Sequence, residues 1–173
     1  MKPPSTDKIV LLIIGGFTAI VLVLIFMISI NESKQAQGSS AVTSYTTNDA
    51  QRPKVIVSGK LADLGTMKVK DEKSAQFTLE NTGTKSLSLS RISTSCDCTF
   101  GQLTINGEKS PEFSMHSKNP WVGTINPGEK AVLEATYRPF IMPVSGPVTR
   151  DVFVSTNDPD NPRLTFTVKA IVE

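Results

Sequence analysis

The apolar residues divide the chain into two parts with different patterns. Residues 9–30 form one uncharged run of 22 residues, rich in Ile, Leu and Val. As an α-helix rising about 1.5 Å per residue, this run spans about 33 Å and matches a hydrocarbon core of about 30 Å. The pattern predicts a single transmembrane helix over residues 9–30, which would place the lipid bilayer among the partners of the chain.

A cleaved secretory signal peptide is the main alternative to this anchor. The apolar region of a signal peptide is usually about 7–15 residues long and ends at a small-x-small cleavage site. Here the run is longer, and residues 31–35 read NESKQ, without such a site. The only cysteines are Cys96 and Cys98, so no cysteine stands at the end of the run for attachment of a lipid. We therefore expect a retained signal-anchor.

Charges beside the run predict its orientation. Residues 1–8 carry Lys2 and Lys8 against Asp7, whereas the other side begins with Glu32 and Lys34. The positive-inside rule favours a cytoplasmic N-terminus, residues 1–8, and an extracytoplasmic C-terminal part. We expect a single-pass, N-in/C-out protein whose domain lies in the periplasm or its equivalent.

Residues 31–53 are expected to form a flexible stalk. They consist mostly of Asn, Ser, Gln, Thr, Gly and Ala and contain few large apolar side chains. Such a composition buries too little surface to offset the entropy lost on ordering.

From residue 54 to residue 173 the apolar pattern has a period of two, which is typical of half-buried β-strands. The alternating apolar positions are Ala75, Phe77 and Leu79; Leu87 and Leu89; Ala131, Leu133, Ala135 and Tyr137; Val152 and Val154; and Leu164, Phe166, Val168, Ala170 and Val172. Turn-forming clusters separate these runs at residues 81–83, 126–129 and 157–162. The pattern predicts an all-β fold: an Ig-like antiparallel β-sandwich of about seven strands.

Charge and motifs argue against two classes of function. Residues 31–173 carry 16 Lys and Arg against 15 Asp and Glu without a basic cluster, so we expect no nucleic-acid partner. The chain has one histidine and lacks both a Gly-rich phosphate loop and a Gly-x-Ser-x-Gly elbow. We expect a protein that is not an enzyme and has no catalytic residues.

The most unusual local sequence is the Cys-x-Cys pair Cys96 and Cys98. Outside the cytosol the pair is expected to oxidise, but in an extended strand its Cα atoms would lie about 6.5–7 Å apart, at the upper limit for a disulfide. A disulfide therefore requires a tight turn. The alternative is a metal site, in which two thiolates with Met115 and His116 would suit copper(I). The sequence is compatible with three states of the two cysteines: a disulfide, two free thiols or a metal-bound pair.

Trp121, the single tryptophan, has two interpretations. It is either an exposed anchor for a binding partner or a large side chain that covers one end of the core.

The order of motifs resembles a known family. The shared pieces are Asn81-Thr82-Gly83, Ser95-Cys96-Asp97-Cys98-Thr99, Pro127-Gly128-Glu129, Tyr137, Gly146 and Ser155-Thr156-Asn157-Asp158-Pro159. They resemble a bacterial family of uncharacterised Ig-like domains with a Ser-Cys-Gly-Cys-Thr signature, of the major-sperm-protein and Hydin-like class. This chain has Asp97 at the usual Gly and a longer insertion over residues 101–123.

That resemblance implies a sandwich fold and an exported or anchored, non-enzymatic protein. We therefore expect a module in the bacterial cell envelope, anchored in the cytoplasmic membrane, that binds a protein partner or gives structural support. The alternative is a copper-binding or thiol-redox accessory protein that uses Cys96 and Cys98.

Overall fold

The computed structural model describes residues 42–173, together with Gly16 and Val21. The predicted cytoplasmic segment 1–8, the rest of the predicted transmembrane helix 9–30 and the first part of the predicted stalk, residues 31–41, lie outside the described residues. Among the residues described, no helix is long and apolar enough to span a membrane. The chain divides into two compact units, Met1–Ser40 and Ala41–Glu173, and the second is a β-sandwich.

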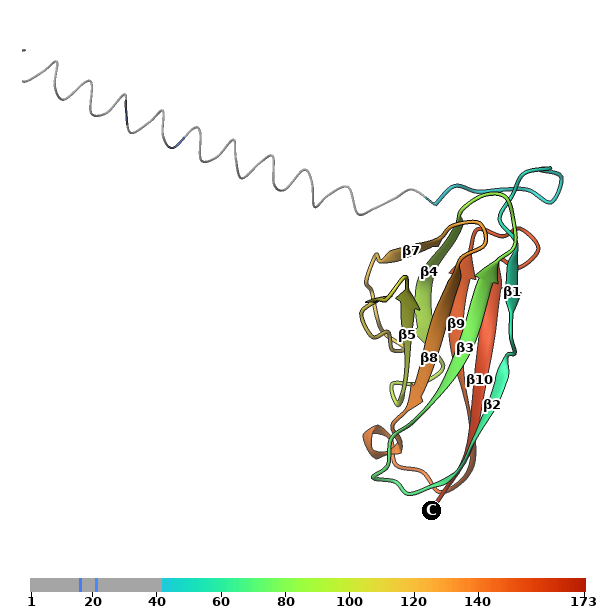
Figure 1. Ribbon diagram of the computed structural model, residues 1–173. Helices are drawn as coiled ribbons and strands as arrows, with labels where there is room; N and C mark the ends of the chain where they lie inside the picture. The colour runs from blue at the N-terminus through green and yellow to red at the C-terminus, as the bar shows by residue number, and fades with distance from the viewer. Residues whose placement is uncertain (1–15, 17–20, 22–41) are drawn as a thin grey trace, which may run out of the picture. The chain divides into compact units, whose positions relative to one another are not determined.

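The sandwich consists of two five-stranded sheets (Figure 1). One sheet has the order β1-β3-β8-β5-β6 and the other the order β2-β10-β9-β4-β7. The strands are β1 (Val55–Val57), β2 (Leu61–Met67), β3 (Lys73–Asn81), β4 (Leu87–Thr94), β5 (Thr99–Ile105), β6 (Glu108–Lys109), β7 (Val122–Ile125), β8 (Lys130–Tyr137), β9 (Gly146–Thr156) and β10 (Arg163–Val172). The predicted all-β sandwich is confirmed, and the predicted number of about seven strands is wrong.

The extra strands come from segments whose alternation is weak. The insertion after residue 100 extends β5, turns through Asn106 and Gly107 into β6, and later supplies β7. Asn106 (φ 50°) and Gly107 (φ 85°) both have positive φ, as a tight Asn-Gly hairpin requires. The other unexpected strand, β2, runs parallel to β10 at the edge of its sheet. Its positive-φ Gly65 interrupts the regular pattern.

Alternation in the long strands places their apolar side chains between the sheets. β3 pairs with β8 so that Phe77 lies opposite Leu133, and β10 pairs with β9 so that Leu164 lies opposite Val154. All four side chains are buried in one large cluster. A second, smaller cluster contains Met67, Cys98, Tyr137, Ala170 and Val172. The packing explains why a period of two in the sequence predicted these strands well.

The two ends of the sandwich differ in chemistry. At the end where residues 42–54 join the domain, here called the entry end, lie the β3–β4, β7–β8 and β9–β10 turns (top of Figure 1). The opposite end, here called the distal end, carries the Cys96–Cys98 turn, the β8–β9 connection and the C-terminus. The second core cluster lies beneath the distal end, because Tyr137 and Val172 end their strands there.

Buried polar side chains hold the entry end together. Asn81, fully buried, accepts hydrogen bonds from the backbone of Lys54 and Gly83. Asp158, also fully buried, accepts from the Val55 backbone N–H at 3.0 Å. These side chains supply acceptors for backbone N–H groups that burial has removed from water.

The last part of the expected stalk contacts this end. Arg52 forms an ion pair with Asp160 at 2.8 Å. The Asn157 side chain donates to the Thr43 carbonyl at 3.2 Å. Residues 43–53 therefore lie against the β9–β10 turn.

Candidate functional site

The two cysteines form a disulfide at the distal end. Both lie in the turn between β4 and β5, where their Cα atoms are 5.3 Å apart. The turn is closed by the Thr94 hydroxyl, which donates to the Cys96 carbonyl at 2.8 Å. The chain thus leaves the extended conformation that would hold the cysteines too far apart. The Asp at position 97 occupies this turn without a positive φ.

The two sulfurs of the disulfide have different surroundings. Cys98 is fully buried, and the Arg150 Nε–H donates to its Sγ at 3.3 Å. Cys96 is partly exposed, and the Thr99 hydroxyl lies 3.2 Å from its Sγ. Arg150 comes from β9, so its place beside Cys98 depends on a sheet pairing between distant segments, which the sequence pattern does not reveal.

Tyr137 lies under the same turn. Its ring faces the Arg150 guanidinium, with 5.6 Å between Cζ and the ring centroid. Its hydroxyl is buried and has no hydrogen-bond partner among the described residues. A buried hydroxyl without a partner has lost its hydration without compensation.

Replacing Tyr137 with phenylalanine is therefore expected to raise the free energy of unfolding by about 0.5–1 kcal/mol. The ring, its packing and its contact with Arg150 are retained. Urea unfolding followed by the fluorescence of Trp121 measures the change. Tyr137→Leu, which removes the ring, should lower stability by about 2 kcal/mol. A loss of stability in Tyr137→Phe would show that the hydroxyl is satisfied, for example by a buried water.

An exposed apolar loop projects from the distal end. It follows β8 and begins with a short 3₁₀ helix, Pro139–Ile141. Its exposed large side chains, here called the apolar tip, are Phe140 (48% exposed), Ile141 (41%), Met142 (49%) and Val144 (37%). The signal for the tip in the sequence is the run Pro139-Phe140-Ile141-Met142-Pro143, which breaks the alternation of β8 and whose two prolines exclude a regular strand.

Arg138 fixes the base of the tip. Its guanidinium makes paired hydrogen bonds with the Glu112 carboxylate, both 3.0 Å, and a further one with Glu72. It also lies over the Phe100 ring, 4.3 Å from the centroid. The hydrogen bonds with Glu112, opposed by partial burial, raise the pKa of Arg138, so the guanidinium stays charged. The Arg138 backbone N–H donates to the Cys98 carbonyl at 2.8 Å, which joins the tip to the disulfide turn.

Of the metal ligands expected from the sequence, the structure brings one close to the cysteine turn. His116 Nδ1 lies 3.1 Å from an oxygen of Asp97, the residue between the cysteines. Met115 is half-exposed, and both sulfurs of Cys96 and Cys98 are in the disulfide. The described residues contain no group of three or more His, Cys, Asp or Glu side chains arranged to hold a metal ion. Copper(I) binding would require the reduced pair and stays a prediction.

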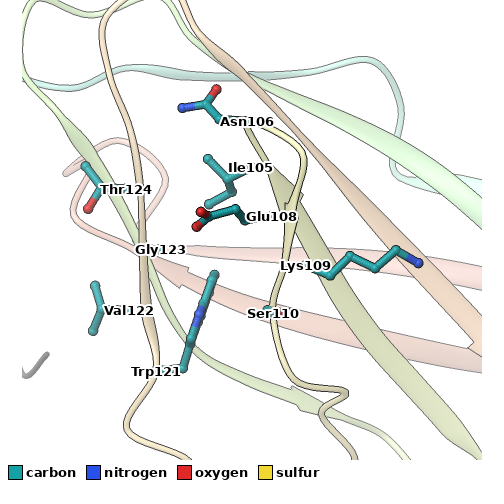
Figure 2. A pocket seen from close by; sticks show the side chains of 9 residues that line it. All are labelled: Ile105, Asn106, Glu108, Lys109, Ser110, Trp121, Val122, Gly123 and Thr124. Carbon is teal, nitrogen blue, oxygen red and sulfur yellow. The ribbon is translucent and has the colours of Figure 1, made fainter. Parts of the chain in front are cut away.

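Trp121 lines a groove on one flank of the sandwich (Figure 2). The groove lies between the β5–β6 hairpin and β7 and has a volume of about 270 Å³. Trp121 is partly buried against the large core cluster, and its ring centroid is 5.8 Å from that of Phe113. Gly123 leaves room for the indole, because a Cβ there would lie 2.3 Å from it.

The structure thus places Trp121 as a cover for the core that keeps part of its surface exposed. The groove is small beside ordinary ligand pockets of about 300–1,000 Å³. A role for Trp121 as an anchor for a binding partner stays a prediction.

The two packed sheets define the class of the domain: an Ig-like β-sandwich. The family profile described as "HYDIN/CFA65/VesB-like, Ig-like domain" matches residues 53–171. The chain belongs to this family. The resemblance found in the sequence is confirmed at the level of the Ig-like family.

Two solved structures are similar to this chain at low sequence identity. A protein of unknown function from Porphyromonas gingivalis W83 is 21% identical, with a TM-score of 0.52, over 76% of this chain and 50% of that one. The PapD-like domain 7 of human CEP192 is 15% identical, with a TM-score of 0.47, over 78% of this chain and 96% of that one. The chain therefore spans half of the Porphyromonas protein. A comparison with curated proteins gave no match.

Proposed function

We propose that this domain is a protein-binding module of the bacterial cell envelope and that the apolar tip is its contact surface. The observation that supports the proposal is the exposure of Phe140, Ile141, Met142 and Val144 within five residues of one loop. Contiguous exposed apolar side chains mark interaction sites on soluble domains, and aromatic residues and methionine are enriched in interfaces. The Ig-like family supports a role in protein interaction in general.

The partner is a protein with an apolar surface rather than a lipid. Two carboxylates, Glu72 and Glu112, pair with Arg138 at the base of the tip, so this arginine is not free to bind anionic lipid headgroups. The tip also lies at the distal end, opposite the entry end.

Substitution of two side chains of the tip tests the proposal. The Phe140→Ser/Ile141→Ser variant of the full-length chain is expected to lose at least about tenfold in partner binding, because truncated anchor side chains each cost about 1–2 kcal/mol. Crosslinking in native membranes, followed by mass spectrometry, identifies and quantifies the partner. Pro139 and Arg138 are unchanged, so the loop keeps the contacts that hold its start against the domain.

The matched control is Leu61→Ser, which removes an apolar side chain of comparable exposure, 59%, from β2. It should leave crosslinking unchanged. Equal crosslinking of the tip variant and the wild-type chain would contradict the proposal. A loss confined to Trp121→Ala would instead assign binding to the flank groove. If the wild-type chain self-associates and the tip variant does not, the partner is a second copy.

A further inference from the structure

The unequal surroundings of the two sulfurs suit thiol–disulfide exchange. In that reaction one sulfur must be reachable by an attacking thiolate, and the other must be stable as the departing thiolate. Cys96 is partly exposed, whereas Cys98 is fully buried. The Arg150 guanidinium, 3.3 Å from the Cys98 sulfur, supplies the positive charge that stabilises a thiolate.

We infer that Cys96–Cys98 is an exchange site that accepts two electrons from a protein dithiol. The first thiolate of the dithiol attacks Cys96 Sγ, the disulfide breaks, and Cys98 leaves as a thiolate beside Arg150. In the mixed disulfide the first sulfur of the dithiol is bonded to Cys96. The second thiolate of the dithiol then attacks that first sulfur and releases Cys96 as a thiolate. The dithiol becomes a disulfide, and the two protons it gives up are taken by the cysteines of this chain, either directly or through solvent.

The fold holds Arg150 in place for this role. One of its terminal amino groups donates to the Thr149 carbonyl at 2.9 Å, and its guanidinium faces the Tyr137 ring. Because these two contacts involve other parts of the guanidinium, the Nε–H stays directed at the Cys98 sulfur. The charge is therefore in position before the disulfide opens, and it need not move to meet the thiolate.

The neighbouring apolar tip indicates why the reductant is a protein. The tip starts at Arg138, whose backbone N–H donates to the Cys98 carbonyl, so the tip begins directly beside the disulfide turn. A protein dithiol can bury apolar surface there, whereas a small charged thiol cannot. The inference extends the proposed function but does not depend on it, because sulfur chemistry and docking are measured separately.

The test uses the full-length chain, kept in mild detergent, and reduced thioredoxin as the protein dithiol. Thiol trapping and mass spectrometry follow the reduction of the folded chain. A thioredoxin that lacks its second cysteine should give a mixed disulfide that peptide mapping locates at Cys96. Arg150→Met should slow reduction about tenfold, because the leaving thiolate loses its cation. Arg150→Lys should restore most of the rate.

The matched control is Arg163→Met, which removes another arginine that lies over an aromatic ring, that of Phe153, at 4.3 Å. It should react at the wild-type rate. Three results would each overturn the inference: no reduction of the folded chain, a mixed disulfide at Cys98, or a wild-type rate in folded Arg150→Met. If Arg150→Met does not fold, the inference is tested by the position of the mixed disulfide and by the reduction rate of Arg150→Lys.

The tip variant Phe140→Ser/Ile141→Ser separates the two proposals. Dithiothreitol should reduce it at the wild-type rate, since its sulfurs and Arg150 are unchanged. If that rate holds but crosslinking to the envelope partner is unaffected by the substitution, the docking proposal fails and the exchange site stands. If crosslinking is lost but thioredoxin and dithiothreitol both leave the folded wild-type disulfide intact, the exchange site fails and the docking surface stands.

Discussion

Replacing Asp158 with alanine is expected to lower the free energy of unfolding by about 3 kcal/mol, since three donors lose their acceptor at about 1 kcal/mol each. The donors are the backbone N–H groups of Val55 and Asp160 and the side-chain amide of Asn161, each at 3.0 Å. The carboxylate is fully buried, so water cannot replace it without a local opening. A domain of this size is stable by about 5–15 kcal/mol in total, so the variant loses a large fraction.

Urea unfolding followed by Trp121 fluorescence measures the loss. Asp160→Ala is the matched control, because it removes an exposed carboxylate two residues away that pairs with Arg52. Surface ion pairs contribute about 0–1 kcal/mol. Equal losses in the two variants would contradict the inference that the buried hydrogen bonds of Asp158 stabilise the fold.

Replacing Gly83 with alanine is expected to lower stability by about 3 kcal/mol through a clash with backbone. A Cβ at Gly83 would lie 2.4 Å from the Arg52 carbonyl oxygen and 2.4 Å from the Lys54 nitrogen. Backbone on both sides of Pro53 cannot move aside as a flexible side chain can. The segment before β1 must therefore leave the β3–β4 turn.

Hydrogen exchange should locate this effect. Amide protection should fall in β1 and in the Thr82 and Thr84 N–H groups, which donate to Lys54 and Arg52 carbonyls at 2.8 and 3.0 Å. Gly59→Ala is the control, because no atom lies within 4 Å of a Cβ at that position. Unchanged protection of β1 in Gly83→Ala would show that the segment accommodates the methyl group.

Sequence reasoning predicted the strands whose two faces differ most in environment. β3, β8, β9 and β10 have one face in the core, so their apolar residues alternate. It missed β2, whose pattern is interrupted at Gly65, and the β5–β6 hairpin, although Asn106-Gly107 is a strong hairpin signal. Asn81 and Asp158 were interpreted as turn formers, and their burial depends on segments that fold against them from far along the chain.

The candidate site was predictable only where it is local. Cys96 and Cys98 are separated by one residue in the sequence, so they can be recognised there as a pair. Arg150 reaches them because β9 pairs with β4, a pairing whose register shifts between Ser90 and Ser93 at the positive-φ Arg91. A bulge of this kind has no simple sequence signature. The tip is not predictable from the sequence, because the exposure of an apolar side chain depends on whether other segments of the fold pack against it.

The location of the entry end and the apolar tip at opposite ends of the sandwich has a mechanical consequence. A pull between the entry end and the distal end runs nearly parallel to the strands (Figure 1). Under such a load the inter-strand hydrogen bonds of the β1–β3 and β3–β8 ladders, which connect the two points of attachment, are sheared together and share the force, whereas a sideways load would open them one at a time. A partner held at the tip could therefore transmit tension through the sandwich without unzipping it.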